Sequence, residues 1–318
     1  MDNSPQETTF NQQVSKNRVK SILLFIGFFL FAEAVIAAIM YFGTGTLNLI
    51  SFLVGSGAAL IVMTVMYFIT PKVAVMMARA EEITADSEPV LWNVVEELAL
   101  AGGTPMPRVY VMRNEQYLNA FATGRDMKHG HVLITQGLLD TLTREELEGV
   151  IAHELSHLRN GDIKVMTLAA SLAMIIGVIA DMATRVAFFG GGNRNNNGPG
   201  AIISVVALLL VAILAPLTAV IIQSAISRNR EALADASAIE LTRNPVGLEN
   251  ALTKISQGGS RVSTAKEQSA HMFFSDPFSG KGKKVSKRKK MGEWVERLFS
   301  THPPIQERID LLRAYRGG

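Results

Sequence analysis

The stretch EELEGVIAHELSHLRNGD, residues 145–162, places two histidines and a glutamate within an apolar helical pattern. His153 and His157 are four residues apart, so at about 100° per residue their imidazoles lie on one face of a helix, about one turn apart. Both rings can then bind one metal ion. Glu154 is displaced around the helix, where its carboxylate reaches a metal-bound water more readily than the metal itself. This spacing is the H-E-x-x-H motif, and it predicts a metal site.

The helix that carries this motif has clear ends. Thr143 followed by Glu146 is the pattern of a capping box, and Gly161 is typical of a residue that ends a helix. One face of the same segment is apolar, which indicates that the helix packs against a core. The residues of this face are Leu147, Val150, Ile151, Leu155 and Leu158.

A catalytic zinc site needs a third protein ligand, because it usually has three and keeps its fourth position for water. The chain has no cysteine, so that ligand must be an imidazole or a carboxylate. In SRNREALADAS, residues 227–237, Glu231 and Asp235 lie four apart on one face of a helix. Glu231 would complete a His2Glu set for Zn2+, and Asp235 would accept the free N–H of a ligand histidine. Zinc lowers the pKa of a bound water to about 7, and Glu154 would take its proton as general base.

The composition favours an integral membrane protein. Of 318 residues, 48% are hydrophobic and only 19% are charged, and the mean hydropathy is +0.23. A soluble enzyme would carry more charge. Residues 21–42 and 47–70 are each long enough to cross roughly 30 Å of hydrocarbon, and they predict a transmembrane hairpin over residues 21–70. Residues 1–20 are polar and predict a disordered cytoplasmic tail.

The charges that flank the hairpin predict its orientation. Lys20 precedes the first span, Lys72 and Arg79 follow the second, and the connection at residues 43–46 carries no charge. By the positive-inside rule both outer flanks are cytoplasmic. We therefore expect the metal site and both termini on the cytoplasmic side of the membrane.

Residues 71–162 have the character of a soluble domain and form its first part. Apolar residues recur at helical spacing over residues 87–100. Residues 108–112 and 131–135 alternate as short strands, and NAFATG, residues 119–124, predicts another strand that ends in a glycine turn. We expect a small sheet beside the motif helix.

Residues 163–226 predict a second apolar pair. Its first segment is interrupted by Asp181 and Arg185, whereas residues 201–226 make a strong span, and the sequence leaves open whether both fully cross the bilayer. Residues 227–318 return to polar and helical patterns and form the second part of the domain. Their carboxylate ligand can meet the two histidines only if the intervening chain crosses the membrane twice or not at all. In either case the site is cytoplasmic.

Five segments stand out in chain order. They are the amino-terminal hairpin, NAFATG (residues 119–124), AHELSHLRNGD (residues 152–162), SRNREALADASA (residues 227–238) and STHPPIQERI (residues 300–309). Together they resemble the M48 family of membrane zinc metalloproteases, most closely its bacterial HtpX-type members, over nearly the whole chain. The resemblance implies an α+β fold: a mainly helical integral membrane protein with a gluzincin-like zinc protease domain that contains a small β-sheet.

The resemblance implies one zinc ion per chain, held by His153, His157 and Glu231. It implies that Glu154 is the catalytic base of an endopeptidase that hydrolyses peptide bonds of misfolded or membrane-associated proteins, in membrane-protein quality control. The competing hypothesis is a membrane scaffold or chaperone-like protein in which zinc only links helices. Glu154 discriminates between the two, because a structural zinc site does not require it.

Further residue roles are implied by the resemblance alone. A substrate segment is expected to lie extended along the sheet edge at Asn119, Ala120 and Phe121, a mode that reads backbone more than side chains. His302 matches a position that helps to hold the oxyanion of the scissile carbonyl, with a helix-start residue before the proline pair as the alternative interpretation. Arg308 matches a buried partner of the site.

The expected partners are protein substrates and the lipid bilayer. The net charge of +3 is mild, so it does not indicate a polyanionic partner. A basic run, KGKKVSKRKK at residues 281–290, contains no aromatic residue. We interpret this run as a solvated loop, with contact to anionic lipid head groups or nucleic acid as the alternative, and we expect no nucleic-acid partner.

Overall fold

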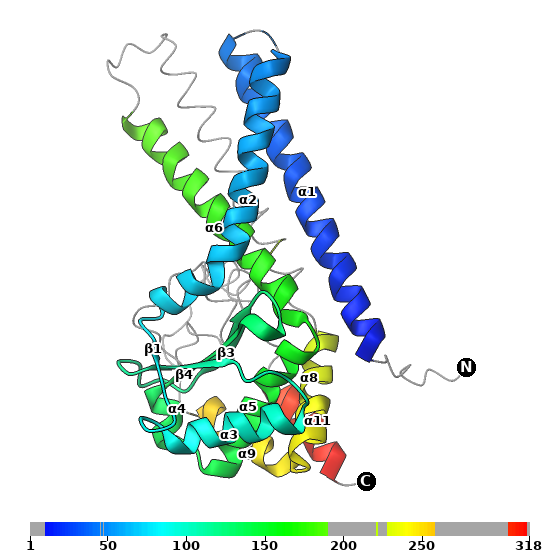
Figure 1. Ribbon diagram of the computed structural model, residues 1–318, viewed down its shortest axis with the longest axis vertical. Helices are drawn as coiled ribbons and strands as arrows, with labels where there is room; N and C mark the ends of the chain where they lie inside the picture. The colour runs from blue at the N-terminus through cyan, green and yellow to red at the C-terminus, as the bar shows by residue number, and fades with distance from the viewer. Residues whose placement is uncertain are drawn as a thin grey trace, which may run out of the picture.

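The structure is a computed structural model that describes residues 10–44, 46, 48–189, 221, 228–257 and 305–316. In this part of the chain, three long helices rise from one side of a domain built from a four-stranded sheet and shorter helices (Figure 1). The predicted α+β class, mainly helical with a small sheet, is confirmed. The long helices are α1 (Phe10–Thr44), α2 (Leu49–Met77) and α6 (Asp162–Phe189).

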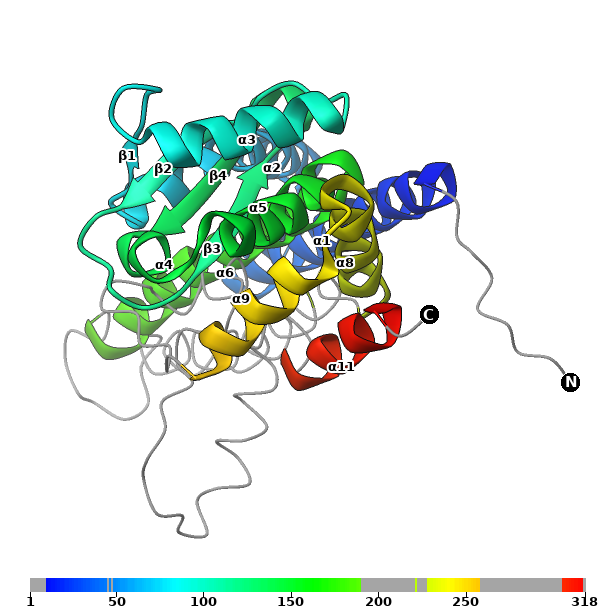
Figure 2. The same cartoon turned by 90° about the horizontal axis from the view of Figure 1, so that it is seen from below.

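The domain is assembled from segments on both sides of α6 in the sequence. Those before α6 are β1 (Glu81–Glu82), α3 (Pro89–Ala101), β2 (Arg108–Met112), β3 (Ala120–Gly124), the short 3-10 helix η1 (Met127–His129), β4 (Gly130–Thr135), α4 (Gln136–Thr141) and α5 (Arg144–Arg159). Those after it are α8 (Arg228–Thr242), α9 (Pro245–Gln257) and α11 (Ile305–Arg316). The helix α11 packs against α9 and α8 (Figure 2), so the carboxyl-terminal helix completes the domain.

Each long helix contains a segment that could cross a membrane by length and composition, with a mean hydropathy of 2.2. These segments are Val19–Ala37, Leu49–Met77 and Asp162–Asp181. Only 6% of each of the first two hydropathy windows is buried, against 61% of the third. The difference arises because α6 packs against α1 and α2 and also against β3 and α5. The helix α6 therefore connects the hairpin with the domain.

The sheet has the strand order β1-β2-β4-β3. Strands β2 and β4 are parallel, with Arg108 opposite His131, whereas β3 is antiparallel to β4. The three strands predicted from the alternation of the sequence are confirmed. Within the described residues, β3 is the last strand in this order and has a strand neighbour on one side only.

Side chains alternate between the two faces of the sheet. Val111 and Ile134 belong to the main core, which α3 and α5 cover from the side away from the long helices (Figure 2). Leu133, on the opposite face, packs in a cluster with Ala74 of α2 and Ala170 of α6. Burying one such aliphatic side chain stabilises the fold by about 1.5–3 kcal/mol. The sheet therefore holds the soluble helices on one face and the bases of the long helices on the other.

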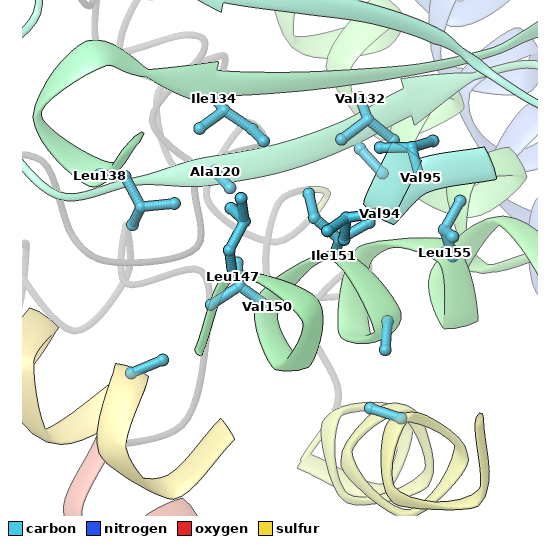
Figure 3. Packing of buried hydrophobic residues seen from close by; sticks show 14 of the residues in the cluster. Val94, Val95, Ala120, Val132, Ile134, Leu138, Leu147, Val150, Ile151 and Leu155 are labelled. Atoms are coloured by element: carbon cyan, nitrogen blue, oxygen red, sulfur yellow. The ribbon is translucent and has the colours of Figure 1, made fainter. Parts of the chain in front are cut away.

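The motif helix α5 forms as its local signals predict. The Thr143 side chain accepts a hydrogen bond from the Glu146 N–H, and Glu146 Oε2 accepts one from the Thr143 N–H at 2.8 Å. Gly161, just beyond the helix, has a φ of 70°, a conformation that glycine adopts without strain. The apolar face points toward the sheet (Figure 3), where Leu147, Val150, Ile151 and Leu155 pack with Ala120, Val132 and Ile134.

The prediction of a disordered tail over residues 1–20 is wrong for its second half, because α1 begins at Phe10. The physical reason is a tertiary contact. Asn17 is buried, and its side-chain amide donates hydrogen bonds to the Asn160 carbonyl and to Asp162. A polar segment that carries no apolar periodicity is thus held as helix by its partner.

The apolar segment after the motif is also longer as a helix than its hydropathy indicates. The helix α6 continues through the positions of Asp181 and Arg185 to Phe189, so these charged residues interrupt the apolar pattern and not the helix. The predicted span at residues 201–226 and the basic run at residues 281–290 lie outside the described residues, apart from Ile221.

Candidate metal centre

His153, His157 and Glu231 meet at one buried point. The helix α5 carries both histidines, α8 carries Glu231, and the two helices pack against each other. His153 Nε2 lies 3.1 Å from His157 Nε2. Glu231 Oε2 lies 3.5 Å from His153 Nε2, and Glu231 Oε1 lies 3.7 Å from His157 Nε2. One ligand atom from each residue falls within 4.8 Å of the others. The predicted trio is therefore brought together by the fold.

These separations fit one tetrahedral ion. Two nitrogens bound to Zn2+ at about 2.0–2.1 Å lie ~3.3 Å apart, close to the 3.1 Å between the two Nε2 atoms. Two imidazole nitrogens that face each other and a carboxylate form an arrangement that a bound cation stabilises. Two histidines and a glutamate are also the protein ligands of one class of catalytic zinc site. The donor set thus fits a zinc ion in both spacing and chemistry.

A carboxylate orients each imidazole from its other side. Asp235 Oδ1 lies 2.8 Å from His153 Nδ1, and Asp162 Oδ2 lies 2.9 Å from His157 Nδ1. With each Nδ1–H donated to its carboxylate, the Nε2 lone pairs of both rings are left for the same point. The sequence predicts that Asp235 accepts the N–H of a ligand histidine; its carboxylate lies beside His153, and its role at a metal site stays a prediction.

Arg308 of α11 holds Asp235 in place. Its Nε and Nη2 donate to Asp235 Oδ2 and Oδ1 at 2.9 and 2.6 Å, and the residue is 1% exposed. Nη2 also lies 3.1 Å from His153 Nδ1, but that nitrogen faces the closer Asp235 and acts as a donor. Burial alone would raise the pKa of Asp235, yet the Arg308 guanidinium and His153 outweigh it and hold the pKa at about 2. Asp235 therefore stays ionised at physiological pH.

Glu154 is buried next to the ligands and is 2% exposed. Its Oε1 has no hydrogen-bond partner among the residues that the structure describes. A buried carboxylate oxygen without a partner is costly, so its presence needs a functional explanation. The charge of Glu154 also acts on His157 and on Arg308, which places it within electrostatic range of the candidate metal group.

The charges around His157 predict how the metal-free protein responds to pH. Burial alone would lower the pKa of His157, but Glu231, followed by Asp162 and Glu154, outweighs it and raises the pKa from 6.5 to about 9. This stabilisation is complete below pH 6.5 and is lost as the pH rises through about 9, which costs up to about 3 kcal/mol. With a chelator present, we expect the melting temperature to fall over this range.

Saturating zinc should remove this pH dependence, because a ligand histidine must be deprotonated to bind the metal. The measurement is the melting temperature against pH, with chelator and with zinc. His129 provides the control, since its side chain is exposed and pairs with Asp126. His157→Gln should flatten the curve of the chelated protein and His129→Gln should not. A chelated wild type whose melting temperature is constant from pH 6.5 to 9 would contradict the prediction.

The structure describes the predicted substrate-binding residues but not His302. Ala120 and Phe121 begin the strand β3, and Asn119 immediately precedes it. This strand packs against the motif helix α5, and its role in binding a substrate stays a prediction. His302 lies outside the described residues, and its role stays a prediction.

Asp162 and Arg230 are buried residues at the site that sequence reasoning missed. A signal for Asp162 is present, because it is an acidic residue directly after the helix-ending Gly161 and begins the next helix. Arg230 directly precedes Glu231 on α8. Burial lowers the pKa of Arg230, while Asp162 and Glu231 act in the opposite direction. No periodicity in the sequence marks Arg230 as a buried residue.

Residues 86–316 match the family model of peptidase family M48. The chain belongs to peptidase family M48. It is 43% identical over 307 residues to the "Protease HtpX homolog" of Ligilactobacillus salivarius. That alignment covers 95% of this chain and 98% of the relative. The proteins of the same name from Listeria monocytogenes serotype 4b and Streptococcus uberis are 44% and 41% identical over 313 and 310 residues, with the same coverage.

Among solved structures, the crystal structure of S. mikatae Ste24p aligns with 95% of this M48 chain and 66% of its own, at 18% identity and a TM-score of 0.45. The predicted family resemblance is confirmed by the family model and the relatives. The M48 chain is therefore a membrane metalloprotease that acts on protein substrates. Its His153, His157 and Glu231 form a buried group suited to hold the metal.

Proposed function

We propose that the protein is an integral membrane zinc endopeptidase that hydrolyses peptide bonds of misfolded or membrane-associated proteins, in membrane-protein quality control. The observation that carries this proposal is the convergence of His153, His157 and Glu231 beside Glu154, a buried carboxylate with an oxygen that has no partner among the described residues. A general base next to a metal site is what metal-assisted hydrolysis requires.

Each side chain has a defined role in this chemistry. Zinc held by the three ligands would supply a Lewis acid that polarises the scissile carbonyl and makes water a nucleophile at neutral pH. Glu154 would accept a proton from the attacking water and deliver it to the leaving amine. Asp235 would hold the Nδ1–H of His153, and Arg308 would keep Asp235 ionised and correctly turned. His302 is proposed to help hold the oxyanion.

We propose that substrates lie extended along β3, at Asn119, Ala120 and Phe121. The packing of β3 against α5, the helix that carries both histidines, supports this proposal. Backbone pairing of this kind selects for an extended, unfolded segment more than for a sequence. It would therefore favour misfolded proteins as substrates.

The proposed location is the cell (inner) membrane, with the site and both termini cytoplasmic. The flanking charges of the hairpin support this orientation. A second observation agrees with it: Asn17, just before the apolar segment of α1, is hydrogen-bonded to Asp162 at the metal site. The flank of the first span and the site therefore share one side of the membrane. The matching relatives and the three apolar helices support the membrane location itself.

The competing scaffold hypothesis uses the same three ligands for a structural zinc. A structural site is closed by four protein ligands, as zinc-finger sites are. Here the described residues supply three, and the glutamate of the motif is buried next to them. This arrangement favours the enzyme.

The test is the metal content and proteolytic activity of the purified full-length protein in detergent. Wild type should bind about one zinc per chain and cleave an unfolded protein substrate, and a chelator should stop cleavage until zinc is restored. Glu231→Ala should lose the zinc and, with it, at least about 100-fold in activity. Glu240 lies exposed on the same helix, so Glu240→Ala is the matched control and should behave like wild type. Equal zinc content in both variants would overturn the proposed ligand set.

A further inference from the structure

Asn17 connects the amino-terminal helix α1 to the metal site. Its side chain is 2% exposed, although it lies in the polar segment before the first span. Its Nδ2 donates to Asp162 Oδ1 at 2.6 Å and to the Asn160 carbonyl at 3.3 Å, across 145 and 143 residues of sequence. Both partners are acceptors, so the amide is oriented with its NH2 group toward the site.

Asp162 uses its two carboxylate oxygens for two different partners. Oδ1 accepts from Asn17, and Oδ2 lies 2.9 Å from His157 Nδ1. Asp162 is fully buried and is the first residue of α6, directly after the turn at Gly161. A continuous series of polar contacts therefore runs from α1 through Asp162 to a metal ligand.

We propose that Asn17 is a positioning residue for the metal site, acting through Asp162 on His157; this rests on the proposed function, since it takes the metal to bind at His157. A carboxylate held at one oxygen can still turn about its Cβ–Cγ bond, whereas one held at both oxygens cannot. The Asn17 amide thus keeps Asp162 Oδ2 in line with His157 Nδ1. Partners of this kind behind a ligand histidine typically change metal affinity by about 10- to 100-fold.

The same contact couples the membrane hairpin to the site. Asn17 lies two residues before Val19, where the apolar segment of α1 begins. The helix α1 packs along α6, whose first residue is Asp162. A shift of α1 along α6 would break the Asn17 contact while α5 and α8, which carry the ligands, stay packed. Metal affinity therefore depends on the position of the first membrane helix, α1, along α6.

The experiment measures zinc affinity by competition with a chromogenic chelator. All proteins are full-length, in detergent, and carry Glu154→Gln so that self-cleavage does not interfere. Asn17→Ala removes the donor and should weaken zinc binding about 10-fold, and Asn17→Asp adds a like charge beside Asp162 and should weaken it more. Ser15, exposed on the same helix, provides the control. Ser15→Ala should leave the affinity unchanged.

A double-mutant cycle separates positioning from general loosening of the fold. If Asn17 acts through Asp162, Asn17→Ala should have no further effect on zinc affinity once Asp162→Ala is present. If Asn17 only stabilises the packing of α1, it should weaken binding by the same factor in both backgrounds. The second result would overturn the proposal, and so would an Asn17→Ala protein with wild-type affinity.

Two further outcomes have distinct meanings. A wild type that binds no zinc would overturn the proposed function and this inference with it, whereas a wild type that binds zinc with no response at Asn17 would overturn the inference alone. Failure of both Asn17 variants to fold would assign the residue to the general fold and would also overturn the inference. Retention of the metal-free melting temperature together with weaker zinc binding supports it.

Discussion

Glu154→Gln is expected to slow peptide hydrolysis by about 10²- to 10⁴-fold, the range that a positioned general base contributes. Glutamine keeps the size of the side chain but cannot accept a proton from water. Glu154 is not one of the three residues whose ligand atoms converge, so the variant should still bind about one zinc per chain. The expected result is a folded, metal-loaded protein that does not cleave.

The measurement combines substrate cleavage on a gel with zinc content for each variant. Glu145 provides the matched control, because it lies exposed in the first turn of the same helix. Glu145→Gln should cleave at the wild-type rate. Cleavage by Glu154→Gln at a similar rate would contradict the role of Glu154 as general base, whereas a wild type that binds zinc and does not cleave would favour the scaffold hypothesis.

Arg308→Met is expected to destabilise the fold by about 3–5 kcal/mol, the cost of breaking a buried ion pair by removing one partner. Arg308 is 1% exposed and makes two hydrogen bonds to Asp235. Its removal leaves the carboxylate of Asp235 buried with His153 as its remaining described partner. The variant should therefore have a lower free energy of unfolding, and His153 should be less firmly oriented.

Arg313 is the matched control for this prediction, because it lies on the same helix and pairs with Glu249 while its side chain is 55% exposed. Arg313→Met should lower the melting temperature of the metal-free protein much less than Arg308→Met. Adding Asp235→Asn to Arg308→Met should recover part of the loss, since the second change removes the unpaired charge. Equal melting temperatures for the two arginine variants would contradict the argument from burial.

Much of the site could be predicted from sequence because its signals are local. The spacing of His153 and His157, the capping box at Thr143 and the stop at Gly161 all lie within one helix and its ends. Helical periodicity alone brings those two imidazoles together. Glu231 could be predicted because it lies four residues before Asp235 in a helical pattern, in a segment that resembles the M48 family.

The tertiary structure decided which groups surround the ligands. The roles of Asp162 as the partner of His157 and of Asn17 as the partner of Asp162 depend on α1, α5 and α6 meeting at one place. The same contact makes residues 10–20 helical, where the sequence predicts a disordered tail. Residues 1–9 lie outside the described part of the chain.

By itself, the sequence determined the class of the protein, its membrane helices and the ligand pair on α5, because hydropathy and periodicity are properties of neighbours along the chain. Only the tertiary structure decided which carboxylate orients each imidazole. It also decided that Arg308 holds one of these carboxylates, Asp235, in place. Those contacts join residues far apart in sequence, and their strength comes from burial, which no local pattern records.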